Sequence, residues 1–186
     1  MAVYKRTYHR YEGPVTPVRW RFLALSRYNF EDVRKLRYVN ALFTVCFFWP
    51  LISAVLIYMN HNLSILKMLG IKGTQVLSID TAFFLTFLGW QGMLAFFLAA
   101  FIGPGLVSPD LANQALPLYL ARPFSRADYV LGKLSVLVIP LSLVTWVPGL
   151  FLFGLQGMFE GFGWMAGNMR IASGLLFGAW IWILVL

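Results

Sequence analysis

Long stretches without a charged residue constrain the fold of this chain more than any other feature of its sequence. They cover residues 41–58, 81–102, 134–153 and 171–186, and none contains Lys, Arg, Asp or Glu. A helix needs about 20 apolar residues to cross the hydrocarbon core of a bilayer, and the first three runs approach or exceed that length. Charged residues make up only 12% of the chain, against about 25% in soluble domains. The sequence therefore predicts an all-α integral membrane protein, a polytopic helical bundle.

The fourth run is the shortest of the set and reaches the last residue, Leu186, without a polar flank. Because a spanning helix needs more residues than this and a polar segment to end it, we expect an incomplete fourth span in a truncated sequence. We predict a single transmembrane domain over residues 20–186.

The distribution of cations predicts the orientation of the bundle. Of the fifteen Lys and Arg, nine lie in residues 1–38, two in 59–80, three in 103–133 and one in 154–170. Cytoplasmic segments carry the excess of positive charge, so the N-terminus and the 103–133 loop are expected in the cytoplasm. A net charge of +8 then reflects membrane topology, and we predict no nucleic-acid partner.

The N-terminal region divides into two predicted parts. Residues 1–19 are basic, rich in Tyr and interrupted by prolines, as expected for a cytoplasmic arm. Residues 20–38 interleave aromatic and aliphatic side chains with Arg, which favours an interfacial helix. Asn29 is expected to cap that helix, with Glu31 and Asp32 in its first turn. The simpler alternative is a basic flank that only sets topology.

Prolines inside the apolar runs predict bends. Pro50 lies in the middle of the first run, where it should kink the helix while neighbouring helices satisfy the freed carbonyl. Pro140 and Pro148 predict a bent or interrupted third span. The Gly-rich and aromatic residues 154–170 that follow are interpreted as an interfacial outer loop.

A polar side chain inside the second run is a further candidate. Gly89 and Gly92 flank the dipeptide Trp90-Gln91. Small residues permit close helix contact, and an intramembrane amide usually faces protein or water rather than lipid. We favour packing between helices as the role of these residues, and a place on a transport pathway remains open.

Residues 103–133 form an island of turn-forming, polar and charged residues between the second and third runs. The Gly-Pro-Gly sequence at 103–105 predicts the end of the second helix. Ser108, followed by Pro109 and Asp110, is the expected N-cap of a short helix over about 109–116. Ser125 is a second expected N-cap, before the chain enters the third span.

The chemistry that is missing from the runs excludes several classes of protein. All seven acidic residues and all fifteen cations lie outside them, whereas ion-coupled transporters and intramembrane hydrolases generally keep ionisable side chains in the bundle. Two His and one Cys, far apart, do not suit a metal site, and Gly132-Lys133 lacks the rest of a phosphate-binding loop. We therefore predict that the chain is not an enzyme and binds no cofactor or metal.

The island carries a series of short elements in order: Ser108-Pro109-Asp110, Asn113-Gln114-Ala115-Leu116, Pro123-Phe124-Ser125-Arg126 and Gly132-Lys133. This series resembles the first cytoplasmic loop of ABC-2 type transporter permeases. Residues 20–38 are similar to the elbow helix of that family, and the resemblance covers most of residues 20–186. It implies a six-span domain, of which about the first three and a half spans are present, in a bacterial or archaeal cytoplasmic membrane.

The resemblance also implies partners and a docking surface. Residues 109–120 would form a coupling helix that binds a separate ATP-binding cassette ATPase, and ATP hydrolysis there would move two permease subunits, in a homo- or heterodimer, for export across the lipid membrane. The implied docking residues are Ser108, Asp110, Asn113, Gln114, Leu116, Tyr119, Arg122 and Arg126. An anchor or assembly subunit without transport, recruiting a cytoplasmic partner through the same loop, is a second class. An intramembrane enzyme, with its catalytic residues beyond Leu186, is a third.

Overall fold

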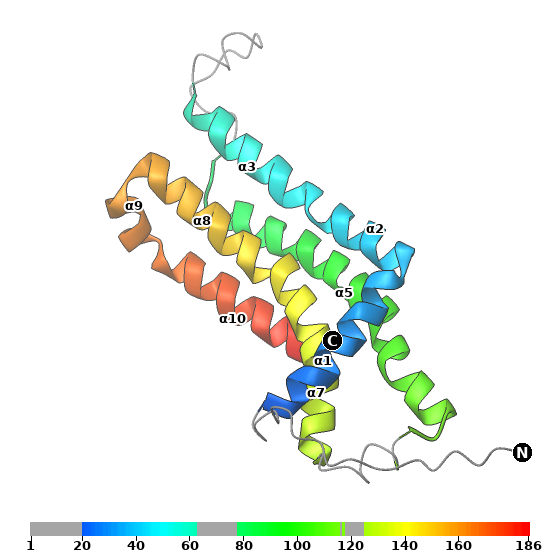
Figure 1. Ribbon diagram of the computed structural model, residues 1–186. Helices are drawn as coiled ribbons and strands as arrows, with labels where there is room; N and C mark the ends of the chain where they lie inside the picture. The colour runs from blue at the N-terminus through cyan, green and yellow to red at the C-terminus, as the bar shows by residue number, and fades with distance from the viewer. Residues whose placement is uncertain (1–19, 63–77, 116, 118–124) are drawn as a thin grey trace, which may run out of the picture.

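The fold is described by a computed structural model, which covers residues 20–62, 78–115, 117 and 125–186. All of its regular elements are helices (Figure 1). In chain order they are α1 (Arg21–Lys35), α2 (Arg37–Cys46), α3 (Phe48–His61), α5 (Thr81–Ala112), α7 (Arg126–Val144), α8 (Trp146–Glu160), α9 (Phe162–Gly167) and α10 (Met169–Val185). The prediction of an all-helical protein is thereby confirmed for the described residues. The predicted arm, residues 1–19, lies outside the described residues.

Three helical stretches are long and apolar enough to cross a membrane: Arg37–His61, Thr81–Ala112 and Arg126–Glu160. They contain the first three apolar runs, and the fourth run forms α10, a shorter apolar helix. Figure 1 shows α3, α5, α8 and α10 side by side, with α1 crossing one end of the bundle and α9 lying at the other. We call these the α1 end and the α9 end.

Two of the long stretches are interrupted, and each interruption lies three residues before a proline. Between α2 and α3 the break is at Phe47, ahead of Pro50, and between α7 and α8 it is at Thr145, ahead of Pro148. A proline has no N–H to donate into the preceding turn, and its ring crowds the carbonyl four residues earlier. The predicted kinks are confirmed at Pro50 and Pro148, whereas α7 continues through Pro140.

The prediction that the Gly-Pro-Gly sequence at 103–105 ends the second helix is wrong. Helix α5 continues to Ala112, so Ser108 is an internal helical residue rather than an N-cap, and no separate helix begins at Pro109. Ile102 and Leu106 are buried on either side of the sequence, and this packing holds the backbone helical where local propensity would end it. Helix α5 ends instead at Ala112 with Asn113 as its C-cap, and Gln114 takes a positive φ of 51°, a common way to close a helix.

Two further boundaries differ from expectation. Asn29 does not cap a helix, because α1 already begins at Arg21 and passes through it. The expected outer loop is mostly helical: α8 extends to Glu160, and Gly161, with φ +94°, turns the chain into α9. The expected cap at Ser125 is confirmed. Its hydroxyl accepts from the Asp128 backbone N–H at 3.1 Å, and its own N–H donates to the Asp128 carboxylate at 3.0 Å.

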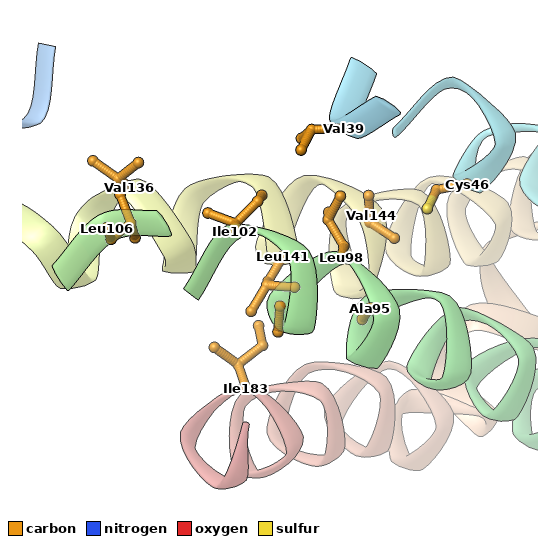
Figure 2. Close-up of a cluster of buried hydrophobic side chains, with 11 residues drawn as sticks. Val39, Cys46, Ala95, Leu98, Ile102, Leu106, Val136, Leu141, Val144 and Ile183 are labelled. Carbon is orange, nitrogen blue, oxygen red and sulfur yellow. The ribbon is translucent and has the colours of Figure 1, made fainter. Parts of the chain in front are cut away.

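Most of the buried apolar side chains in the described residues form two separate clusters, one toward each end of the bundle. The α1-end core joins α2, α5, α7 and α10 and consists of Val39, Cys46, Ala95, Leu98, Ala99, Ile102, Leu106, Val136, Leu141, Val144 and Ile183 (Figure 2). The α9-end core joins α3, α5, α8 and α10 and consists of Ile57, Ile79, Phe84, Phe87, Leu152, Phe153, Ile171 and Leu175. The two cores meet at the level of the breaks at Phe47 and Thr145.

Candidate functional site

The described flanks of the predicted docking loop lie at the α1 end of the bundle. Helix α5 leads into the loop and α7 leads out of it, while α1 packs along α7 more extensively than along any other helix (Figure 1). The side chains that join these three helices therefore determine how firmly the loop is held.

A buried ion pair connects the two flanks of the loop. Lys133 on α7 donates to the carboxylate of Asp110 on α5 at 2.8 Å, and the two side chains are 9% and 13% exposed. The hydroxyl of Tyr129 donates to the same carboxylate oxygen at 2.9 Å. Because an unpaired charge would be costly at this depth, the pair keeps the last turn of α5 beside the first two turns of α7.

The same lysine also binds α1. Its ammonium donates to Oδ1 of Asn29 at 2.8 Å, while Nδ2 of Asn29 donates to the backbone carbonyl of Leu25 at 2.7 Å. Lys133 therefore connects α1, α5 and α7 through a single charged group. This partner explains why Asn29 is placed in the middle of a helix, facing the bundle, instead of at a helix start.

A second polar contact lies one turn away on the same interface. The hydroxyls of Ser26 and Ser135 are 2.7 Å apart, and the Ser26 hydroxyl donates to the carbonyl of Gly132 at 3.2 Å. Gly132 permits this approach, since a Cβ there would lie 2.9 Å from Cδ2 and 3.3 Å from Cβ of Leu25. Helix α1 is thus seated on α7 by close backbone packing and by hydrogen bonds.

Towards its C-terminal end α1 also carries charged side chains that are exposed. Lys35 donates to Asp32 at 2.7 Å, with both side chains more than two-thirds exposed. This hydrogen bond, and then the attraction of the Asp32 charge, raises the pKa of Lys35. Helix α1 therefore presents one face to the bundle and one to its surroundings, as an amphipathic helix does.

The predicted docking residues do not all face the same way. Ser108, Asn113, Gln114 and Arg126 are exposed at the α1 end, whereas the carboxylate of Asp110 is turned into the bundle by its contacts with Lys133 and Tyr129. The remaining members of the predicted set, Leu116, Tyr119 and Arg122, lie outside the described residues.

Sequence reasoning missed the residues that hold this end together: Lys133, Asn29, Ser26 and Ser135. A signal was available for α1, because Ser26 and Asn29 are three residues apart and therefore lie on one face of the helix. Leu25 and Ser26 are buried and Asn29 is half-buried. Polar residues on a buried face need partners, which points to a polar contact with another helix.

The polar candidate of the second span also makes interhelical contacts. Gln91 is fully buried, and its side-chain amide donates to the backbone carbonyls of Cys46 at 3.0 Å and Val144 at 2.6 Å. The favoured interpretation, packing between helices, agrees with this geometry.

The two glycines beside Gln91 differ from each other. The indole N–H of Trp182 on α10 donates to the carbonyl of Gly92 at 3.0 Å, and a Cβ at Gly92 would lie 3.3 Å from that nitrogen. A Cβ at Gly89 would meet nothing within 4 Å. Of these two glycines, Gly92 therefore serves as a close-approach residue between α5 and α10, and Gly89 does not.

Comparison of the chain with models of protein families, with curated proteins and with solved structures finds no match. The function must accordingly be inferred from the residues and their geometry.

Proposed function

We propose that this chain is the transmembrane permease subunit of an ATP-binding cassette transporter, acting as an exporter, with ATP hydrolysed by a separate subunit. The observation that carries the proposal is the buried pair of Asp110 and Lys133. It ties together the two flanks of a loop whose sequence resembles the ATPase-docking loop of ABC-2 permeases.

A rigid attachment is what a docking loop of this kind requires. A partner that pushes on residues 113–124 moves the spans only if the flanks of the loop transmit the displacement. Asp110 and Lys133 hold the flanks to each other, and Asn29 holds α1 to Lys133. Because packed elements move as rigid bodies rather than deforming continuously, a displacement of the loop would reach α1, α5 and α7 together.

The exposed chemistry at the same end suits a protein partner. Asn113 and Gln114 present amide groups, and Arg126 presents a guanidinium that can bind carboxylates in a bidentate manner. In this proposal these residues and Ser108 contact the ATPase directly, with Leu116, Tyr119 and Arg122 completing the surface. In this proposal Asp110 does not contact the ATPase but is a positioning residue, because its pair with Lys133 holds the flanks of the loop together.

The sides of the bundle expose apolar surface that the other expected partners, lipid and a second permease subunit, can cover. Less than half of each candidate span is buried within the chain, and large apolar side chains such as Leu85, Phe101 and Phe151 are more than half exposed. Such surfaces are covered by lipid or by another subunit. The proposed transporter uses both, with two permease subunits in a cytoplasmic membrane and the α1 end in the cytoplasm.

Co-purification with the cognate ATP-binding cassette subunit tests the proposal. Arg126→Glu and Leu116→Asp should each reduce recovery of the complex at least about ten-fold, the effect of losing roughly 1.4 kcal/mol of binding free energy. Arg170→Glu is the matched control, since it reverses an exposed arginine at the α9 end and should leave recovery unchanged. Recovery that is unchanged in both loop variants would contradict the proposed docking surface.

A further inference from the structure

The side chain of Gln91 contacts two helices in addition to its own. It belongs to α5, the carbonyl of Cys46 ends α2, and the carbonyl of Val144 ends α7. A glutamine amide has two N–H donors, so these contacts use both of them. A single side chain therefore connects the second span to the middle of the first and third.

The two carbonyls are not arbitrary acceptors. In an α-helix the carbonyl of each residue accepts from the N–H four residues later, and a proline has no such N–H. Cys46 lies four residues before Pro50, and Val144 lies four residues before Pro148. Gln91 therefore donates to both of the carbonyls that these two prolines leave without a helical partner.

The position of this contact in the bundle matters as much as its chemistry. Cys46 and Val144 lie together at one end of the α1-end core, away from Leu106 and Val136 (Figure 2). The α9-end core begins on the far side of the breaks. Gln91 itself lies between Phe87, which belongs to the α9-end core, and Ala95, which belongs to the α1-end core. The amide thus occupies the plane where the two cores meet.

We propose that Gln91 couples the two proline breaks into one hinge, about which α3 and α8 swing together relative to α2 and α7. Helices α3 and α8 pack on each other in the α9-end half, while α5 and α10 cross the plane without a break. Because one amide binds both carbonyls, a bend that moves one carbonyl also moves the amide, and the amide then moves the other carbonyl. Both spans therefore change direction together. This inference goes beyond the ATPase partner and does not depend on it.

Distances between spin labels across each break test the coupling. One pair of labels at Tyr38 and Tyr58 spans the first break, and a second pair at Leu131 and Met158 spans the other; all four side chains are exposed. The background carries Cys46→Ala, which removes the thiol and keeps the backbone carbonyl that Gln91 binds. Both distance distributions in Gln91→Leu are expected to widen by a few ångströms, because both breaks lose their shared donor.

Gln156→Leu is the matched control. Gln156 is as deeply buried as Gln91, but within the described part of the chain its amide donates to Glu160 of the same helix, at 3.4 Å, and to no other helix. Both distributions should keep their parent widths in this variant. The proposal is overturned if Gln91→Leu changes neither distribution or only one of them, or if Gln156→Leu widens both to the same extent.

A second experiment decides the matter if Gln91→Leu does not fold in the parent chain. Pro50→Ala and Pro148→Ala together return a helical N–H to each carbonyl, so Gln91→Leu should be tolerated in that background. Recovery of folded protein at the level of that background supports the proposal. An equal loss of folded protein in both backgrounds means that Gln91 does not act through the proline breaks, and overturns it.

Discussion

Removing one member of the buried pair should destabilise the bundle more than removing both. In Lys133→Met the Asp110 carboxylate keeps the Tyr129 hydroxyl but loses its counter-ion at 2.8 Å. Breaking a buried pair from one side costs about 3–5 kcal/mol. The retained Tyr129 contact places the expected cost near the lower limit, about 3 kcal/mol. For a chain of this size the melting temperature should fall by about 6–12 °C.

The double variant Lys133→Met, Asp110→Asn removes both charges and keeps an amide oxygen that can accept from Tyr129. Without a buried unpaired charge, the expected loss is about 1 kcal/mol, or about 2–4 °C. The assay is thermal unfolding of the purified protein in one detergent, followed by circular dichroism. Lys35→Met is the control, because its pair with Asp32 is just as short at 2.7 Å but exposed. It should leave the melting temperature unchanged.

The comparison of single and double variants is decisive for this reasoning. If the double variant melts at or below the melting temperature of Lys133→Met, the loss of stability in Lys133→Met does not come from the unpaired Asp110 carboxylate. The same conclusion follows if Lys35→Met is as destabilising as Lys133→Met, since burial would then have no part in the effect.

The packing and capping contacts give three smaller expectations, all measured by thermal unfolding. Gly132→Ala forces α1 away from α7 and should cost about 1–3 kcal/mol, whereas Gly103→Ala meets nothing within 4 Å and should be neutral or stabilising. Gly92→Ala should lower the melting temperature through the tight indole contact, and an equal loss in Gly89→Ala, which enters open space, would contradict this. Ser125→Ala removes a capping hydroxyl and should cost about 1 kcal/mol; no loss would mean that the cap is not stabilising.

Local chemistry made some features of this fold predictable. Ser125 stands three residues before Asp128 at the start of an apolar run, and both groups needed for the cap are in that short sequence. The break at Pro50 was equally readable, because a proline disrupts its own helix whatever surrounds it. Both predictions depend on atoms within a single turn.

The failures depend on atoms that are distant in sequence. The Gly-Pro-Gly sequence at 103–105 would end an isolated helix, but burial of its neighbours against other helices keeps α5 intact. Asn29 looks like a helix cap, yet its partner, Lys133, is 104 residues further along the chain. No pattern within one segment contains either fact.

The candidate site was predicted in part for the same reason. Asp110 and Lys133 both belong to the elements that resemble a permease loop, but the sequence did not show that they pair. Gln91 was expected to join helices, and the identity of its acceptors depends on three spans being aligned in depth. Spacing along the chain cannot give that alignment.

The division of the interior into two cores has a consequence for how the protein unfolds locally. Cooperative units of a protein unfold separately when each has its own buried contacts. The two halves of α5 then belong to different units, although the helix itself is continuous. In amide hydrogen exchange, protection along this one helix should fall into two classes, with the change in rate near Gln91.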